Sequence, residues 1–478
     1  MHPVPPAVNP AAALLCNTCY IKVVNSKLWE INVAGAAAFR HTVRMADVPQ
    51  PGIATVPADA TSVPRRVVTG PISWRRTFAA LRHRNYRLFM GGQLVSLIGT
   101  WMQTVAVGWL VYELSHSAMT LGFVGFIGAL PMTLLTLPAG ALADRVPKRR
   151  ILLVTQIGAM MLAFVLAGLV WWGTIEVWHV AALSVLLGVT NAFDVPARQS
   201  FIVELVGKDD LMNAIALNSS MFNTARVVGP AVAGVVIASV GTAACFLLNG
   251  LSYLAVIASY LLMRLPVASV QHDGHSLWRA TGHVIRYAAG EPVIRAVMIM
   301  VAVMSLFGWS YSVLLPVFAR DILHLNARGF GMLVSANGIG ALLGALTLAS
   351  LGNYPHRRRL LFAGVTGFCV TISLFGISRH PWLSAAALVG VGYSMILFFA
   401  TANTIVQLRS HDELRGRVMG LYALAFLGLN PFGSILAGAV AQATSAPVTV
   451  WLGAAVCAGA GIIIARRTRP GGVPGPTS

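Results

Sequence analysis

The chain has 478 residues, of which 56% are hydrophobic and only 10% are charged, and its mean hydropathy is +0.73. These values exclude a soluble globular protein, because water would not tolerate so much apolar surface. The formal net charge of +19 could suit a nucleic-acid partner, but the basic residues are distributed as in a membrane protein, as described below, and we expect no nucleic acid.

The N-terminal segment, residues 1–73, is rich in Pro, Ala and Val and has no sustained periodicity. Its apolar run is too short to span a bilayer and lacks a clean cleavage site. We expect a disordered cytoplasmic tail, with Met45 as an alternative start of the protein. Residues 74–87 are amphipathic and basic, which predicts a helix on the anionic membrane surface before the first span.

Apolar stretches of about 20 residues then recur along the chain, and this is the length that crosses a bilayer core of about 30 Å. We predict transmembrane helices at residues 88–112, 119–142, 151–171, 177–194, 217–240, 242–263, 293–318, 329–350, 360–378, 382–405, 418–442 and 447–465.

The distribution of Lys and Arg orients these twelve helices. The even-numbered connections and the tails next to the membrane hold 26 of the 34 basic residues, whereas the odd-numbered connections hold three. Basic residues favour the cytoplasmic side, so both termini are predicted to be cytoplasmic, in a multi-pass protein of the bacterial inner membrane. The lipid bilayer is then one expected partner.

An internal repeat divides the chain into two related halves. A shift of 209 residues lays Ser96-Leu97-Ile98-Gly99 on Ser305-Leu306-Phe307-Gly308, and a shift of 203 lays Asp209-Asp210-Leu211 on Asp412-Glu413-Leu414. We therefore predict an all-α membrane protein with two pseudo-symmetric bundles of six transmembrane helices. The arrangement is typical of a transporter with a site between its halves.

The predicted boundaries follow from this repeat. The N-terminal bundle covers residues 74–265, a polar cytoplasmic linker 266–290, the C-terminal bundle 291–467, and a cytoplasmic tail 468–478.

The turn after the second predicted helix reads Gly140-Ala-Leu-Ala-Asp144-Arg145-Val-Pro147-Lys148-Arg149-Arg150. It resembles the signature of the major facilitator superfamily, with Pro147 in place of a glycine and Lys148 in place of an arginine. A basic loop that only orients the protein is the alternative reading. The resemblance implies the major facilitator fold and a cytoplasmic latch between the halves. The latch residues would be Gly140, Asp144, Arg145, Lys148, Arg149, Asp194 and Arg417.

The resemblance implies that this latch holds the two halves in the outward-open state, where Asp144 faces the start of the eleventh helix near Arg417 and Asp194 pairs with the basic cluster.

A second stretch narrows the resemblance. Residues 191–206 read NAFDVPARQSFIVELV, and residues 412–419 read DELRGRVM. Both are similar to the enterobactin-exporter-like branch of the superfamily, also called transmembrane secretion effectors, and the match runs from about residue 78 to 465. That resemblance implies export of a small amphiphilic molecule, either a siderophore or a drug, with protons as the coupling ion as in drug:proton antiporters.

The fifth predicted helix contains Arg226, Gly229, Pro230 and Gly234, similar to a Gly-Pro motif of the superfamily's antiporters. A proline removes one backbone hydrogen bond and small neighbours allow close helix packing, so the motif predicts a bend between bundles. Membrane helices are also generally richer in Gly and Pro. Arg226 lies within the span, and we expect it to face the cavity or a partner unless it snorkels to the surface.

Polar side chains at helical spacing identify candidates for the substrate cavity. In the first helix, Gln93, Ser96, Thr100 and Gln103 form one stripe, which either lines the cavity or bonds to neighbouring helices. The remaining candidates lie on helices of both halves: Asn223, Arg226, Trp309, Tyr311, Asn337 and Tyr393.

The function expected is therefore secondary active export by alternating access, carried out by a monomer without cofactor or metal. The acids near the bilayer, Glu113, Asp144 and Asp194, all fall at ends of predicted helices, so no coupling residue is predicted at mid-depth. A lipid or lysolipid translocase of the same fold is the alternative. A membrane-embedded enzyme or a sensor is a further class, and the absence of intramembrane His or acid clusters argues against the enzyme.

Overall fold

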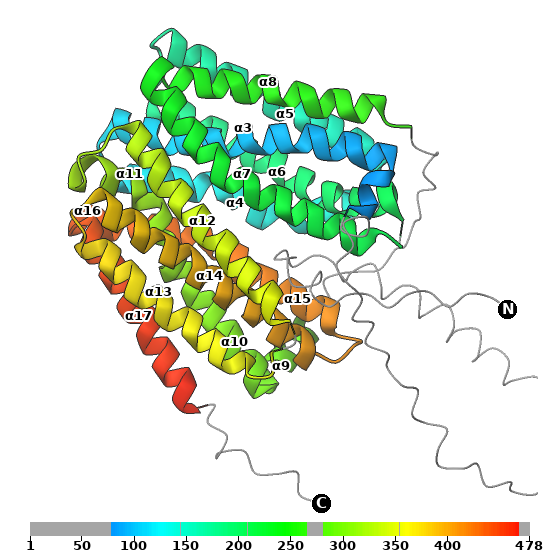
Figure 1. The fold of residues 1–478 in the computed structure, drawn as a ribbon, viewed down its shortest axis with the longest axis vertical. Helices are drawn as coiled ribbons and strands as arrows, with labels where there is room; N and C mark the ends of the chain where they lie inside the picture. Colours follow the sequence, from blue (N-terminus) through cyan, green and yellow to red (C-terminus); the bar gives the residue numbers. More distant parts are fainter. Residues whose placement is uncertain (1–77, 144, 208, 265–280, 353, 468–478) are drawn as a thin grey trace, which may run out of the picture.

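The computed structural model describes residues 78–467, apart from residues 144, 208, 265–280 and 353 (Figure 1). This part of the chain contains 12 helices that are long and apolar enough to cross a membrane, which confirms the predicted all-α class and number of spans. Large apolar side chains such as Leu134, Val154 and Val370 are more than 60% exposed. Lipid rather than water suits such a surface.

The N-terminal half contains a 3-10 turn and six long helices. These are η2 (Ala79–Arg82), α3 (Arg84–Ser115), α4 (Ala118–Ala143), α5 (Lys148–Trp171), α6 (Val177–Val206), α7 (Leu211–Val240) and α8 (Thr242–Leu262).

The C-terminal half has more interruptions. Its elements are α9 (Thr281–Gly290), α10 (Pro292–Val303), η3 (Met304–Gly308), η4 (Trp309–Leu314), α11 (Leu315–Val317), η5 (Phe318–Ile322), α12 (Ala327–Leu351), α13 (Arg357–Ile377), α14 (Pro381–Arg409), α15 (Arg415–Ala423), η6 (Leu424–Gly428), α16 (Asn430–Ala443) and α17 (Ala446–Arg467). The elements from α10 to η5 form one span, and α15 to α16 form another.

Two predicted boundaries need correction. Helix α6 continues to Val206 instead of ending at residue 194, and α7 begins at Leu211 instead of residue 217. The polar run after residue 194 resembled a loop, but Asp194 and Pro196 are buried against other helices, so the helix continues through them. The last ten residues of the predicted linker form helix α9.

The predicted surface helix at residues 74–87 is also wrong in its described part. Residues 79–82 form only the turn η2, and α3 already begins at Arg84. Both Ala80 and Tyr86 are fully buried, and the Tyr86 hydroxyl donates a hydrogen bond to the Ala214 carbonyl over 2.7 Å. This segment therefore docks onto the N-terminal half through its buried side chains.

The two halves lie side by side in Figure 1, coloured blue to green and yellow-green to red. Helix α7 packs on α12, and α4 packs on α16. We call the end where α3 begins and α8 finishes the basic end, and the end with the turn between α3 and α4 the opposite end. The described polar contacts between halves lie at the opposite end or near the middle: Tyr112 with Asp321, Ser117 with Gln442, Arg226 with Asn337, and Ser335 with the Val227 carbonyl.

Glycines allow this close packing at the opposite end. A β-carbon added at Gly438 would lie 2.7 Å from the Ala118 carbonyl oxygen and 2.9 Å from the Gly122 α-carbon. Real β-carbons do not approach backbone atoms so closely, so α4 and α16 can touch here only without side chains. The halves are thus closed against each other at the opposite end.

Candidate functional site

A polar cavity of about 260 Å³ opens on the inner face of the N-terminal half. Five helices, α3 and α5 to α8, supply its lining. The lining residues are Ser96, Leu97, Thr100, Trp101, Thr104, Thr155, Gln156, Ala159, Thr190, Asn191, Asp194, Arg198, Phe222 and Tyr253. We refer to this set as the polar cavity.

An acid and a base lie together in the polar cavity. Asp194 is only 4% exposed and accepts hydrogen bonds from Thr155 Oγ1 at 3.0 Å and Gln156 Nε2 at 2.8 Å. Its other oxygen lies 3.4 Å from Nε of Arg198, one turn further along α6. A buried carboxylate is stable only with such donors and an opposite charge.

The position of Asp194 corrects one expectation. It lies about 18 Å along α6 from the residue that ends the helix, Val206, at 1.5 Å per residue, so it is not at a helix end. In the conformation described, its partner is Arg198, and Lys148 of the α4–α5 turn pairs with Glu204, so the pairing of Asp194 with the basic cluster in the outward-open state stays a prediction. The error arose because α6 was predicted to be twelve residues too short at this end.

The polar stripe of the first helix divides between two roles. Ser96 and Thr100 line the polar cavity. Gln93 and Gln103 are buried and bond to α8: Gln93 Nε2 donates to the Tyr260 hydroxyl at 3.3 Å, and Gln103 Oε1 accepts from Asn249 Nδ2 at 2.6 Å. The stripe therefore both lines the cavity and joins α3 to α8.

Beside the polar cavity, Arg226 lies between the two halves near the middle of the 30-residue α7. Its guanidinium carbon is 5.9 Å from the ring centre of Trp101 in α3 and 5.9 Å from that of Trp309 in η4. Its Nη2 donates to Asn337 Oδ1 in α12 at 2.9 Å. Arg226 thus contacts two helices of the C-terminal half, and it does not reach a helix end as the snorkelling alternative requires.

The irregular seventh span places Trp309. The π-helical turn η3 ends at Gly308, and the 3-10 turn η4 begins at Trp309. π-Helical turns inside α-helices are frequent at functional sites because they redirect side chains. Trp309 also packs on Phe399 and Phe426, with ring centres 6.0 and 5.8 Å away.

Other cavity candidates have more structural roles. Asn337 accepts the hydrogen bond of Arg226, and its Nδ2 donates to the Tyr311 hydroxyl at 2.8 Å. Both residues therefore help to position the guanidinium. Asn223 donates to the Ser219 carbonyl in its own helix. Tyr393 packs with Leu348 and Leu397, away from the polar cavity.

The Gly-Pro motif of α7 faces two neighbours. A β-carbon at Gly229 would lie 2.5 Å from Cβ of Trp101, and one at Gly234 would lie 2.9 Å from the Ala327 carbonyl oxygen. The Pro230 carbonyl similarly lies where a side chain on Gly331 would be, at 2.4 Å. The motif lets α7 approach α3 in its own half and α12 in the other half.

The predicted latch lies partly outside the described residues, because Asp144 is among those not described. Gly140 and Arg145 lie at the end of α4 and just after it, and a β-carbon at Gly140 would meet no atom within 4 Å. Arg149 donates to the Leu261 carbonyl at 3.1 Å, within the N-terminal half. Arg417 is exposed on α15.

Sequence reasoning missed several cavity residues, notably Trp101, Thr155, Gln156, Arg198 and Phe222. One available signal was the spacing of Asp194 and Arg198, which are four residues apart and share a helix face. Thr155 and Gln156 carried no comparable signal, because single polar residues in an apolar helix do not reveal which helix they face.

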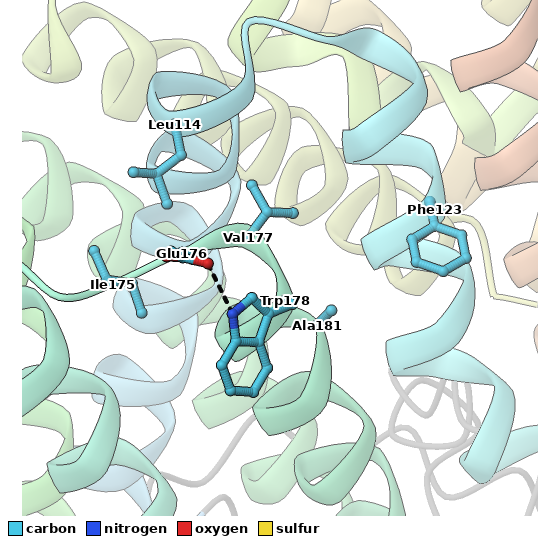
Figure 2. Close-up of a pocket in the computed structure, with 7 residues that line it drawn as sticks. All are labelled: Leu114, Phe123, Ile175, Glu176, Val177, Trp178 and Ala181. Carbon is cyan, nitrogen blue, oxygen red and sulfur yellow. Dashed lines mark hydrogen bonds between the residues drawn. The ribbon is translucent and has the colours of Figure 1, made fainter.

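A larger cavity of about 590 Å³ opens at the opposite end, between α3, α4 and the start of α6 (Figure 2). Its lining is apolar apart from Glu176, which accepts a hydrogen bond from Trp178 Nε1 at 2.8 Å. An exposed Trp beside a helix end is typical of residues at a membrane interface. The polar cavity has the convergent charged and polar groups of a binding site, so we assign the candidate site there despite its smaller size.

The fold agrees with solved transporters. A bacterial homologue of the human lysosomal transporter Spinster, in an inward-facing and unoccupied conformation, has a TM-score of 0.60 at 13% identity, and the match covers 83% of this chain and 96% of that chain. The nucleoside transporter NupG has a TM-score of 0.63 at 12% identity, with 80% and 98% covered.

Sequence relatives cover most of the chain. The staphyloferrin A transporter of Staphylococcus aureus is 25% identical over 73% of this chain and 88% of its own length. The multidrug efflux pump Tap of Mycolicibacterium fortuitum is 29% identical over 76% and 90%. The enterobactin exporter EntS of Citrobacter koseri is 24% identical over 77% and 88%.

The family described as transmembrane secretion effector matches residues 75–471, and the relatives named above are transporters, not enzymes. The chain therefore belongs to the transmembrane secretion effector family of the major facilitator superfamily and is a multi-pass membrane transporter of small molecules.

Proposed function

We propose that the protein exports a small amphiphilic molecule, a siderophore or a drug, by alternating access in exchange for protons. The proposed exchange for protons rests on one observation: a buried acid, Asp194, is paired with Arg198 in the polar cavity. The relatives named for staphyloferrin A, enterobactin and multidrug efflux support export. They do not favour the lipid or lysolipid alternative.

Asp194 has the surroundings that proton exchange requires. Intramembrane ionisable residues are rare and usually mark substrate or proton pathways. The carboxylate lines the polar cavity, and the guanidinium of Arg198 lies 3.4 Å from one of its oxygens. Binding a proton would release Arg198 for other contacts, and this change in pairing can be coupled to the positions of the two halves.

Alternating access has support from the glycines of one helix pair. At the opposite end, Gly122 of α4 and Gly438 of α16 are in contact. At the basic end of the same pair, a β-carbon at Gly140 of α4, or at Gly416 or Gly420 of α15, would meet no atom within 4 Å. Small residues that face open space in one state are suited to close packing in another, so rocking of the halves would close the basic end.

For orientation, we propose that the basic end faces the cytoplasm, with both termini there and the protein in the inner membrane. The excess of Lys and Arg at this end supports it. The conformation described here is then open to the cytoplasm. We further propose that one chain is sufficient for transport, because the polar cavity and Arg226 are both formed within a single copy.

Sealed proteoliposomes test the function directly. The probes are two xanthene dyes of similar size and opposite charge, fluorescein and the cationic methyl ester of rhodamine. An imposed pH gradient should drive accumulation of at least one dye, and a protonophore should abolish it. A phospholipid with a fluorescent headgroup in the same vesicles should not change leaflet.

The Asp194→Asn variant separates coupling from transport. It should exchange dye down a concentration gradient but fail to respond to the pH gradient, whereas Asp209→Asn, at an exposed acid beyond α6, should behave as the native chain. Gradient-driven accumulation by Asp194→Asn would overturn the role of Asp194. Failure to move either dye, or movement of the lipid instead, would overturn the export proposal.

A further inference from the structure

Arg226 is a cation without a matching anion among the residues that the structure describes. Its recorded hydrogen-bond partner is Asn337 Oδ1, which is neutral, and its two ring contacts, Trp101 and Trp309, are also neutral. The nearest charged pair in the polar cavity, Asp194 with Arg198, already balances itself. Inserting a charged residue into a membrane-spanning helix costs about 2.5–3.5 kcal/mol of free energy, and such residues usually mark substrate or ion pathways.

The contacts of Arg226 leave most of its donors available. A guanidinium has five N–H donors, and one is directed to Asn337. Contacts with the faces of aromatic rings use the flat surface of the guanidinium and occupy none of these donors. The side chain is partly exposed, so an anion entering between the halves could accept two parallel hydrogen bonds from it.

Aromatic side chains surround this position on both sides. In the N-terminal half, Trp101 packs against Phe222, with ring centres 5.7 Å apart, and both line the polar cavity. Phe222 lies one turn before Arg226 in α7, so both side chains are on one helix face. In the C-terminal half, Trp309 packs against Phe399 and Phe426. An apolar or aromatic body would therefore find surfaces on both halves.

We infer that the substrate is an organic anion with an apolar body, whose carboxylate, sulfonate or similar group binds Arg226 while its body packs against Trp101 and Trp309. This inference rests on the proposed export function and narrows its substrate class. Because Arg226 and the two rings come from both halves, such a molecule would contact both at once and would lose one set of contacts when they separate. Cationic amphiphiles would be repelled by Arg226.

Binding to the purified full chain in nanodiscs of phosphatidylcholine tests the inference without requiring transport. Fluorescence anisotropy should show tighter binding of fluorescein than of the cationic rhodamine ester. Arg226→Gln should weaken fluorescein binding by about 10- to 100-fold, as expected for loss of a charge-assisted hydrogen bond. Arg226→Lys should retain part of the affinity, and Trp309→Leu should weaken binding without reversing the charge preference.

The matched control is Arg379→Gln, which removes the same charge from an exposed loop and should leave both dyes unaffected. Inorganic phosphate should compete weakly, since it lacks an apolar body. Equal binding of the two dyes, unchanged fluorescein affinity in Arg226→Gln, or displacement by phosphate at the concentration of the dye would overturn the inference. If Arg226→Gln does not fold, Arg226→Lys decides: weakened fluorescein binding that remains tighter than that of the cationic dye supports the inference, and unchanged fluorescein affinity or a preference for the cationic dye contradicts it.

The two proposals fail in different ways. If fluorescein binds through Arg226 but the protein in proteoliposomes does not transport it, the export proposal is wrong and the anion site stands. If a pH gradient drives transport of the cationic dye and Arg226→Gln does not change that transport, the export proposal stands and the anion site is wrong.

Discussion

The guanidinium of Arg226 and the side-chain amide of Asn337 join the two halves near the middle of the molecule, with 2.9 Å between Nη2 and Oδ1. The same amide donates to the Tyr311 hydroxyl at 2.8 Å, which fixes its orientation with the oxygen toward Arg226. A neutral acceptor at this position holds the cation in place without neutralising it. The charge of Arg226 therefore remains available between the halves.

An Asn337→Asp substitution should neutralise the charge of Arg226 with a carboxylate of the protein itself. The new carboxylate would pair with the guanidinium at the distance of the present hydrogen bond, and such charge-assisted bonds are about twice as strong as neutral ones. We expect the variant to fold with an unchanged or higher melting temperature but to lose binding of fluorescein. The control is Asn326→Asp at the N-cap of α12, where Asp is as good a cap as Asn. Unchanged dye binding in Asn337→Asp would show that the charge of Arg226 is not used.

Substitution Gly438→Ala should open the opposite end. The added methyl group would lie 2.7 Å from the Ala118 carbonyl oxygen, and the backbone of α4 must move away to accommodate it. With Ser434→Cys as a buried reporter near Gly125, a membrane-impermeant thiol reagent added from outside should react faster in the Gly438→Ala background. Gly459→Ala, where a β-carbon meets no neighbour, should not change the rate. Equal rates in all three proteins would contradict closure at this end.

The orientation in the membrane can be measured with reporter fusions. Reporters fused after residues 115, 175 and 380 should lie outside the cytoplasm, and those fused after residues 148, 275 and 412 should lie inside it. The reason is that 26 of the 34 basic residues are on the same side of the membrane as residues 148, 275 and 412. A reversed pair would contradict the twelve-span topology.

Substitution of Asp144 tests the predicted cytoplasmic latch. The residue lies outside the described part of the structure, so its role remains a prediction from the resemblance of the α4–α5 turn. A carboxylate near a helix N-terminus contributes about 0.3–1 kcal/mol when exposed and up to about 2 kcal/mol when partly buried. Losing it from one state should shift the equilibrium several-fold, so Asp144→Asn should slow export and raise thiol labelling at the basic end while expression and melting temperature stay nearly native.

Two outcomes of that experiment would reject the latch. Normal export with unchanged labelling would show that Asp144 is not used. A variant that does not fold would show a structural role, and Arg417→Gln, at an exposed residue, would then test the partner side of the latch without that risk.

The number of spans, their approximate limits and the division into halves followed from the sequence alone. These properties depend on local composition, since any stretch of about 20 apolar residues must satisfy its own backbone as a helix in lipid. The motif of residues 140–150 and the stretch at residues 191–206 were likewise sufficient to recognise the family. The identity of Arg226 as a charged residue inside a span was also visible in the sequence.

Only the tertiary structure decided which polar residues meet. Gln93 and Ser96 belong to one stripe, yet Gln93 bonds to α8 and Ser96 lines the cavity, because helices from distant parts of the chain pack on different portions of the stripe. The pairing of Asp194 with Arg198, and the position of Arg226 between Trp101 and Trp309, depend on helix length, on the π-helical turn before Trp309 and on contacts between halves. The contacts of Gln93 with α8 and of Arg226 with the two rings join residues far apart in the chain, and neither hydropathy nor local periodicity contains them. The pairing of Asp194 with Arg198 is local, but it forms only because α6 continues past residue 194.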